Sequence, residues 1–291
     1  MNWREFFRRS AAVVCAAALL CTAPGARAAE EPVHLLLIGV DGRSEEARGR
    51  SDAVLLCSFV PGDGRVVMTS FLRDLYISIP GHGSNRLNAA YAMGGAELLR
   101  ETLEQRFDLP IRGSVEVDFD RFPGLIDQLG GVELELRADE AELIRQNCPG
   151  SSLTPGRNRL NGQQTLCFAR IRTLDADGDF SRTRRQQQIL RALLERWRRA
   201  DAGELLKLAG AVLGMVSTDL NPVQLLSWVL RMAPEMESLE VFAIRIPAAG
   251  TYRFCRVRGM DVLVADWERN TAVLRESLEK SFHGAGQRDL H

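Results

Sequence analysis

The sequence predicts a single α/β domain whose mixed central β-sheet is covered by helices on both faces. Short unbroken apolar runs, such as VHLLLIGV at residues 33–40, are typical of strands that are buried on both faces. Segments with helical spacing alternate with these runs over the whole chain. The composition, with 45% hydrophobic and 26% charged residues in 291, is that of a globular protein with a sizeable core.

The N-terminal half is predicted to begin with three strands. Residues 33–40 are followed by apolar runs at 53–60 and 65–72, and the turn residues Pro61-Gly62-Asp63-Gly64 between these two runs indicate a hairpin. The spacing of leucines at 98, 99 and 103 predicts a helix over 95–107. The next expected elements are a strand, a short helix and a strand, at 115–119, 122–129 and 131–136.

The C-terminal half is predicted to be mainly helical before it returns to strands. We expect helices at 182–199, 204–216, 222–231 and 267–281, and strands at 239–244 and 260–265. The segment TLCFARIRTL, residues 165–174, alternates as a strand would, so that Leu166, Phe168, Arg170 and Arg172 share one side. Two arginines would therefore extend an apolar row.

The N-terminal segment reads as a secretory signal. Arginines at 4, 8 and 9 precede an apolar run at 11–23, and a small-residue cleavage sequence ends at Ala28. Because about 20 apolar residues are needed to span a bilayer, we expect cleavage, with retention as a short anchor as the alternative. The expected organisation is a signal peptide at 1–28, a linker at 29–33, one domain at 34–283 and a polar tail at 284–291.

The charge balance argues against a nucleic-acid partner. The chain has 37 Lys and Arg against 38 Asp and Glu, and loss of residues 1–28, with four arginines and one glutamate, changes the formal charge from −1 to −4. Only Lys207 and Lys280 are lysines. The arginine excess is explained either by a GC-rich genome or by recognition of phosphate or carboxylate groups.

Four cysteines remain once the signal segment is set aside. Cys148 and Cys167 flank a polar stretch rich in Pro and Gly, and we expect a disulfide between them that adds about 3 kcal/mol by the chain-entropy argument. The alternative is two unrelated buried thiols. Cys57 is expected to be a core thiol. No Cys and His spacing typical of zinc is present.

Two aspartates at strand ends are candidate metal ligands. Asp41 follows the first strand and Asp52 begins the second, so their carboxylates could share one Mg²⁺, a cation that prefers oxygen ligands and often bridges substrate phosphates. On position alone, aspartates at strand ends are more often turn residues than metal ligands.

The helix that opens at Asp179 carries polar groups on its buried face. On a helical wheel, Asp179, Arg182 and Gln186 fall on the same side as the later Ile189 and Leu193. Burial of such groups is costly, so they must pair with one another or line a cleft; a solvated helix start is the alternative. Free N–H groups at the helix start would favour an anion.

Five arginines form a candidate anion-binding group. Forked guanidinium groups bind phosphate oxygens in pairs, so several of them around one pocket would indicate a diphosphate. The candidates are Arg73, Arg86, Arg170, Arg172 and Arg182.

These residues lie within seven ordered motifs that resemble the LytR-CpsA-Psr family of exported cell-wall enzymes. The motifs are GVDGR, GRSDAVLL, SFLRDLYISIP, RLNAAYAMGG, DFDRFPGLIDQLGGVEL, LNGQQTLCFARIR and DGDFSRTRRQQQIL. The resemblance covers about residues 34–200 and a later DVLVADWERN. It implies an α/β domain with a hydrophobic groove for a polyprenyl diphosphate lipid, and transfer of a glycopolymer such as teichoic acid or capsule to peptidoglycan.

The resemblance also implies roles for individual residues. Asp41 and Asp52 match the family's magnesium-associated aspartates, with manganese as a substitute for Mg²⁺. The matched diphosphate-binding and helix-start positions are Arg43, Arg73, Arg86, Arg170, Arg172, Asp179, Arg182 and Gln186; of these, Arg73, Asp179 and Arg182 join the two aspartates as the expected catalytic set. Leu72 departs from the family pattern, which has proline there.

The expected activity is a magnesium-dependent phosphotransferase at the outer face of the cytoplasmic membrane, with peptidoglycan as acceptor. Either Asp41 or Asp52 would accept the proton of the attacking hydroxyl. One alternative is an exported polyprenyl diphosphate phosphohydrolase. Another is a non-catalytic module that binds anionic wall polymer or regulates transcription. No GxSxG, Walker-type or GxGxxG motif is present, which disfavours a serine hydrolase, an NTPase and a dinucleotide enzyme.

Overall fold

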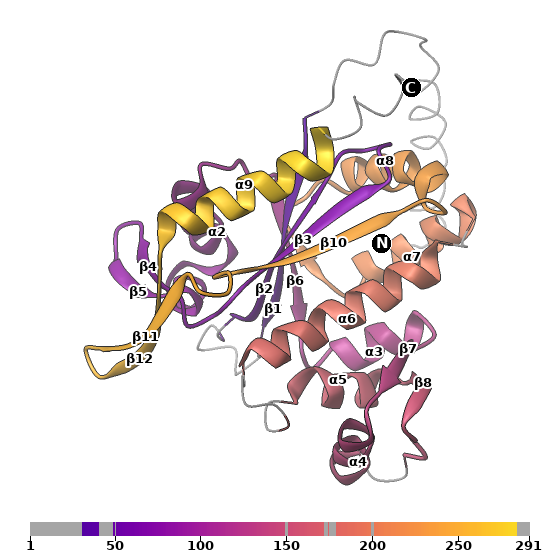
Figure 1. The fold of residues 1–291 in the computed structure, drawn as a ribbon. Coiled ribbons are helices and arrows are strands. Elements are labelled where there is room, and N and C mark those ends of the chain that lie inside the picture. The colour runs from indigo at the N-terminus through magenta and orange to yellow at the C-terminus, as the bar shows by residue number, and fades with distance from the viewer. Residues whose placement is uncertain are drawn as a thin grey trace, which may run out of the picture.

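The computed structural model describes residues 31–40, 49, 51–148, 151–171, 174, 179–198 and 201–283. It confirms the α/β architecture: a six-stranded sheet of order β10-β3-β2-β1-β6-β9 has helices on both faces (Figure 1). No helix within these ranges is long and apolar enough to cross a membrane. The expected signal segment and polar tail lie outside the described residues.

The central sheet is mixed, as the alternation of elements predicts. β1 pairs antiparallel with β2 and parallel with β6, while β3 pairs antiparallel with β2 and parallel with β10. The strands are β1 (Val33–Val40), β2 (Ser51–Phe59), β3 (Arg65–Phe71), β6 (Gly113–Asp118), β9 (Ser217–Thr218) and β10 (Glu240–Ile246). The first three arise from the apolar runs, and the expected hairpin joins β2 to β3.

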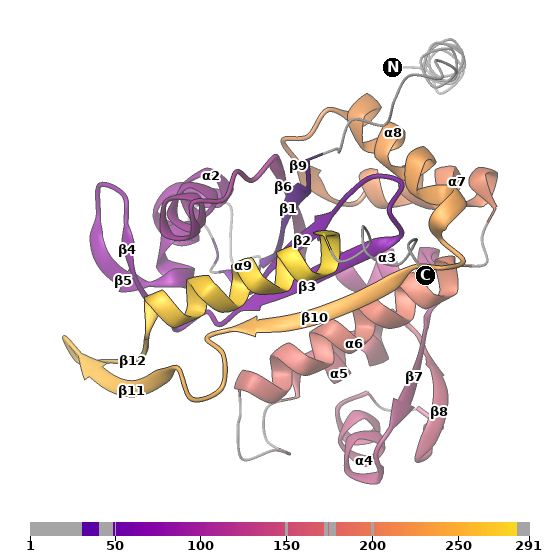
Figure 2. The same cartoon turned by 45° about the horizontal axis from the view of Figure 1, so that its top comes forward.

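One face of the sheet is covered by α2 (Leu87–Phe107) and α9 (Trp267–His283) (Figure 2). Alternate strand residues such as Leu36, Ile38 and Leu56 point to this side and are at most 1% exposed. α2 begins eight residues before the expected start at residue 95. Gly95 interrupts the helix at φ 71°, a conformation that glycine adopts easily.

The opposite face is covered by α6 (Asp179–Trp197), α7 (Ala202–Leu213) and α8 (Pro222–Met232), followed by the short 3-10 helix η1 (Ala233–Glu235). Leu35 and Val66 pack on this side against Leu205 and Trp228. Many side chains of α7 and α8 are only partly buried, in contrast to the dense packing under α2 and α9.

A third cluster of elements lies beside α6. It contains α3 (Phe122–Gln128), α4 (Ala138–Asn147), α5 (Gly162–Arg170) and the hairpin of β7 (Val132–Leu136) and β8 (Gly156–Leu160). A disulfide joins Cys148 at the end of α4 to Cys167 in α5, the pairing expected from the sequence. Two more hairpins pair β4 (Tyr76–Ile79) with β5 (Gly83–Arg86), and β11 (Tyr252–Val257) with β12 (Met260–Ala265).

The strand expected over residues 165–174 is wrong, because residues 162–170 form helix α5. Asn161 caps this helix: its side chain accepts a hydrogen bond from the Gln164 N–H at 2.9 Å, and the Gln164 side chain bonds back to the Asn161 N–H. Leu166 and Phe168 are buried while Arg170 is exposed, so these residues do not share one side. A short apolar–polar alternation fits a helix as well as a strand, and the Asn-x-x-Gln cap distinguishes them.

Candidate functional site

Asp52 and Arg73 meet where β2 begins and β3 ends. The antiparallel register pairs Val54 with Phe71, so residues two positions further out on each strand are also opposite each other. A guanidinium nitrogen of Arg73 lies 2.6 Å from a carboxylate oxygen of Asp52. Both side chains are about one fifth exposed, at 22% and 21%, so this pair remains open to a ligand.

Arg182 contacts the backbone of the same aspartate. It lies in the first turn of α6, is only 4% exposed, and donates a hydrogen bond to the backbone carbonyl of Asp52 at 3.2 Å. Its neighbours Ser181 and Thr183 are also buried. The solvated helix start, considered above as an alternative, is therefore wrong: this polar turn is enclosed and contacts the sheet.

Asp74 links Arg73 to Arg86. Arg73 Nε and Arg86 Nη1 each lie 3.6 Å from a carboxylate oxygen of Asp74. Arg86 ends β5, and its buried Nε has no hydrogen-bond partner among the described residues. The result is a row of alternating charges, Arg182–Asp52–Arg73–Asp74–Arg86, where β2 begins and β3 ends, and its guanidinium groups are of the forked kind that binds anions.

Arg170 stands near this edge but makes a different contact. Its guanidinium carbon lies 5.4 Å from the centre of the Phe119 ring. The Phe119 N–H donates to the carbonyl of Val40, the last residue of β1, at 3.0 Å. Gly39 allows this ring to pack closely, since a Cβ at Gly39 would lie 3.1 Å from it. Arg170 is thereby placed next to the end of β1.

Some of the remaining predicted site residues lie outside the part of the chain that the structure describes. Asp41, Arg43 and Arg172, and the side chain of Asp179, lie outside the described residues. Gln186 is half-buried one turn beyond Arg182 on α6. The structure thus brings Asp52, Arg73, Arg86 and Arg182 into one connected group with Arg170 nearby, while the other predicted positions stay predictions.

The fit to magnesium rests on a single described carboxylate. Asp52 has a hard oxygen ligand at the right strand end, but that carboxylate also accepts from Arg73. Within the ranges that the structure describes, no three His, Cys, Asp or Glu side chains are grouped as a metal site. Asp52 is compatible with the chemistry of a Mg²⁺ site completed by a second aspartate, and the Asp41–Asp52 pair remains an expectation.

Two residues of the site were not identified from the sequence. Asp74 could have been noticed because it directly follows Arg73. Arg245 lies over the ring of Phe180, with its guanidinium carbon 4.3 Å from the ring centre, beside the start of α6. Its position near the end of β10 was the available signal, but the sequence does not show that β10 pairs with β3.

An apolar cavity of about 300 Å³ lies between the sheet and the helices α6, α7 and α8. Its walls are entirely hydrophobic side chains, including Leu35 and Phe59 from the sheet and Trp197, Ala209 and Trp228 from the helices. Such a space suits a hydrocarbon chain, because it offers no polar partner to water.

The cavity and the charged row lie at opposite ends of the same strands, roughly 24 Å apart along β2. Between them, Leu37, Gly39, Ala53 and Val117 are only partly covered, although their strands are internal to the sheet. Leu37 and Gly39 alternate with buried residues and share the side of Leu35. We call these four partly covered residues the apolar lane; along the strands they lie between Leu35, which lines the cavity, and the strand ends at Asp52 and Arg73.

The thiol of Cys57 lies in apolar surroundings that affect its protonation. This cysteine lies opposite Leu35 in the register, is partly uncovered, and burial in apolar surroundings raises the pKa of its thiol to about 12. The thiol is therefore protonated at neutral pH and is not a nucleophile.

A second cavity, of about 900 Å³, is charged and lies between the β7–β8 hairpin and the end of α6. Its four arginines are already engaged. Arg157 pairs with Glu133 at 2.6 Å and Arg198 with Glu195 at 3.0 Å, while Arg159 and Arg196 each donate to the Gly130 carbonyl at 2.9 Å. Unlike the first cavity, it is lined largely by charged side chains, and none of the residues of the charged row lines it.

Comparisons with known proteins agree with this geometry. A model of the LytR_cpsA_psr family matches residues 16–276. Regulatory protein MsrR of Staphylococcus aureus strain COL is 34% identical over 216 residues, which are 72% of this chain and 64% of MsrR. Polyisoprenyl-teichoic acid–peptidoglycan teichoic acid transferase TagU of Bacillus cereus strain AH820 is 34% identical over 167 residues, 57% of this chain and 53% of TagU. The chain thus spans less than two thirds of either relative.

Solved structures share the fold. A structure of TagT described as bound to LI-WTA superimposes with a TM-score of 0.69 at 25% identity, covering 87% of this chain and 91% of TagT. The similarity therefore includes the central sheet and most of the surrounding helices.

Proposed function

Because the chain belongs to the LytR-CpsA-Psr family, we propose that it is an exported phosphotransferase that moves a glycopolymer from a polyprenyl diphosphate carrier to peptidoglycan. The name of TagU, a teichoic acid transferase acting between polyisoprenyl-teichoic acid and peptidoglycan, supports this reaction class. The structure of TagT with LI-WTA supports the same kind of donor. The proposed place of action is the outer face of the cytoplasmic membrane.

One observation carries the proposal: a row of arginines and aspartates lies at one end of strands whose other end lines a hydrophobic cavity, with the partly covered apolar lane between them. A diphosphate needs several cationic hydrogen-bond donors, and a polyprenyl chain needs a long nonpolar surface. Arg73, Arg86, Arg170 and Arg182 supply the first requirement. The lane and the cavity supply the second.

The proposed reaction is a displacement at phosphorus. The acceptor hydroxyl oxygen attacks the phosphorus that carries the glycopolymer, the bond between this phosphorus and the bridging oxygen breaks, and the lipid phosphate leaves. Arg73 and Arg182 neutralise the charge that develops on the diphosphate oxygens, so positioning and electrostatics supply most of the catalysis. The proton of the hydroxyl passes to Asp41 or Asp52.

Magnesium, or manganese in its place, is proposed to be held by Asp41 and Asp52. When bound, the ion would draw electron density from the diphosphate oxygens. Asp52 would be held in position by Arg73 through its carboxylate and by Arg182 through its carbonyl. Removal of the metal ion by a chelator is expected to abolish turnover. Added Mg²⁺ is expected to restore turnover in the native protein but not in Asp52→Asn.

The test uses purified protein, a labelled lipid-linked glycopolymer and peptidoglycan. We expect the label to move to peptidoglycan, and Arg182→Ala to stop this movement while the unfolding temperature shows a folded protein. Release of label as free soluble polymer would indicate the phosphohydrolase instead. Unaltered polymer binding by Asp52→Ala, without turnover by the native protein, would indicate a binding or regulatory module.

A further inference from the structure

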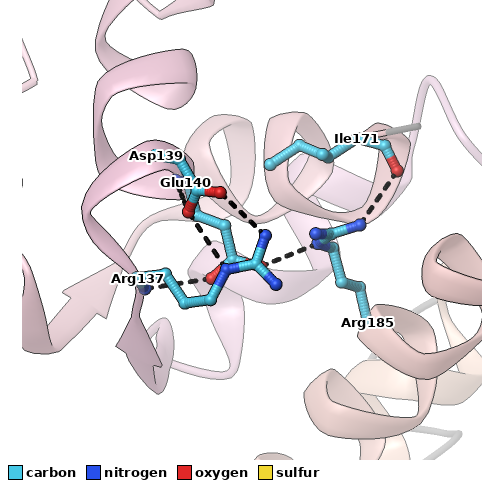
Figure 3. Close-up of polar contacts among 5 residues, drawn as sticks. All are labelled: Arg137, Asp139, Glu140, Ile171 and Arg185. Atoms are coloured by element: carbon cyan, nitrogen blue, oxygen red, sulfur yellow. Dashed lines mark hydrogen bonds and ion pairs between the residues drawn. The ribbon is translucent and has the colours of Figure 1, made fainter. Parts of the chain in front are cut away.

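A buried ion pair joins the helices behind the charged row. Arg185, one turn after Arg182 on α6, places its Nε 2.9 Å from a carboxylate oxygen of Glu140, near the start of α4. The two side chains are 3% and 7% exposed. The same guanidinium donates to the carbonyl of Ile171 at 3.3 Å (Figure 3). Its carbon also lies 5.9 Å from the centre of the Phe168 ring.

Glu140 is itself fixed from its own helix. Its second carboxylate oxygen accepts the backbone N–H of Arg137 at 3.0 Å, which closes the capping box of α4 (Figure 3). Because both carboxylate oxygens are used, Glu140 has a defined orientation toward Arg185. The capping contact orients the carboxylate, and the ion pair transfers this orientation to α6.

The contact of Arg185 with Ile171 bears on the site. Ile171 ends α5 and directly follows Arg170, whose side chain lies over Phe119 at the end of β1. At its middle, α5 is also tied to the end of α4 by the Cys148–Cys167 disulfide. α5 is therefore attached to α4 by a covalent bond at its middle and, through Arg185, by the ion pair at its end. We call this arrangement the α4–α5 brace.

Stability alone is a poor explanation for this pair. Removing two charges from water costs free energy that their mutual attraction often only just offsets, and apolar residues of similar size stabilise a protein as well or better. The pair instead fixes geometry, because the planar guanidinium donors of Arg185 set the distance and the angle between α6, α4 and the end of α5.

We propose that Arg185 and Glu140 are positioning residues that hold the end of α5, and with it Arg170, in register with Arg182 for binding a diphosphate. The inference rests on the proposed function for the identity of the ligand. It assigns no substrate contact to either residue: Arg185 acts through Ile171 and Arg170, and Glu140 acts through Arg185.

The main test replaces the buried pair by apolar groups, with Glu140→Leu and Arg185→Met in one protein. Since no buried charge is left unpaired, this variant is expected to fold, with an unfolding temperature lowered only by the loss of the capping hydrogen bond from the Arg137 N–H. We expect its Kd for geranylgeranyl diphosphate, measured by calorimetry, to rise at least tenfold. Hydrogen exchange of the amides at 165–171 should become faster at the same time.

A matched control removes an exposed ion pair from the neighbouring hairpin. Arg157 and Glu133 lie 2.6 Å apart and are 81% and 52% exposed, so Arg157→Gln with Glu133→Gln should leave both Kd and exchange unchanged. Arg185→Lys keeps the charge opposite Glu140 but loses the fork that also reaches Ile171. We expect this variant to weaken binding too, by a smaller factor.

Native Kd and native exchange at 165–171 in a folded double variant would overturn the proposal. If the double variant does not fold, native Kd in Arg185→Lys has the same meaning. The exchange measurement needs no ligand. Failure of the native protein to bind geranylgeranyl diphosphate would therefore refute the proposed function, while faster exchange in the variant would still support the brace.

Discussion

Each described arginine of the candidate site is oriented by a specific neighbour. Arg73 is held by Asp52, Arg86 approaches Asp74, and Arg170 lies over Phe119. Aspartates between the arginines reduce the repulsion among positive charges while the ligand is absent. A diphosphate would supply the remaining negative charge, so the row is arranged to receive an anion with little rearrangement.

At this scale we expect Arg73→Ala to lower kcat/KM for glycopolymer transfer by about 10²- to 10³-fold, the usual effect of losing one donor to a developing oxyanion. Arg73 is central in the row, since it contacts both aspartates. Arg275→Ala is the control, because Arg275 is an exposed residue of α9 whose carboxylate partner is also exposed. Transfer rates of the two folded variants, measured side by side, check the expectation; equal rates would contradict it.

His34 gives the fold a pH dependence that is separate from the site. Burial, and then the positive charge of Arg112, lower its pKa from 6.5 to about 4. The neutral ring is hydrogen-bonded to Ser58 at 2.8 Å. As the pH falls from 6.5 toward 4, the unfolded chain takes up a proton that the folded protein refuses, so stability is present above this window and is lost within it.

The expected loss from this histidine is on the order of 3 kcal/mol between pH 7 and pH 4. His34→Gln cannot take up the proton, and its amide can still bond to Ser58. Urea unfolding at a series of pH values should show a shallower fall in stability for the variant over this window. Parallel curves for the two proteins would show that His34 is not the cause.

Among single residues, the sequence was informative about charge but not about partners. Asp52 could be selected because it lies at a strand end, and Arg182 because it lies on a buried helix face. Arg73 and Arg86 were selected as arginines of two further motifs. Asp74 was passed over, although it is the residue that links Arg73 to Arg86. Its role depends on the β4–β5 hairpin, which returns Arg86 to the end of β3 and leaves no periodic pattern in the sequence.

The packing of individual elements depends on a few close approaches. α5 lies against α3 so closely that a Cβ on Gly162 would be 1.9 Å from the carbonyl oxygen of Pro123. The Gly162 N–H also donates to the Asp127 carboxylate at 2.7 Å. Glycine is therefore required here by contact between two backbones, and this contact fixes where the helix bearing Arg170 begins.

We expect Gly162→Ala to destabilise the protein by about 3 kcal/mol or more, because backbone cannot move aside as a flexible side chain can. Gly210→Ala is the matched control: Gly210 is an exposed glycine of α7 whose added Cβ would have no neighbour within 4 Å. That change should stabilise by about 0.5–1 kcal/mol through helix propensity. Denaturant unfolding of both variants gives the comparison, and equal stabilities would refute the role of Gly162.

Elements with a long apolar run or a long helical period were predictable, whereas short ones were not. β1, β2 and β3 follow directly from their hydrophobic residues, and α6, α7 and α8 were expected within a few residues of their ends. α5 was mistaken for a strand because nine residues contain only two and a half helical turns, so both periods fit. α4, with a low share of apolar residues, was not expected at all.

The molecule as a whole has two unequal layers around its sheet. The layer of α2 and α9 is dense, while the layer of α7 and α8 encloses the apolar cavity. The sequence predicted helices on both faces and, through the family resemblance, a hydrophobic groove. It could not place this groove, because the space depends on how α7 and α8 pack rather than on the pattern within either helix.

At this scale we expect Ala209→Trp to fill part of the cavity without unfolding the protein. Binding of a long-chain polyprenyl diphosphate should then weaken at least tenfold, while binding of inorganic pyrophosphate stays unchanged, since the arginines are at the other end of the strands. Ala211→Trp, on the same helix but not in the cavity wall, is the control. Loss of pyrophosphate binding in Ala209→Trp would contradict separate sites for chain and head group.

The apolar cavity beneath α7 and α8 leaves a portion of the domain's interior unfilled. A hydrocarbon tail lying there would act as a removable piece of core, so α7 and α8 should open more often in the empty protein than in the loaded one. Release of the lipid phosphate product would then be coupled to local opening of these two helices. The low local stability of α7 and α8 would therefore determine how quickly the protein releases product and begins another catalytic cycle.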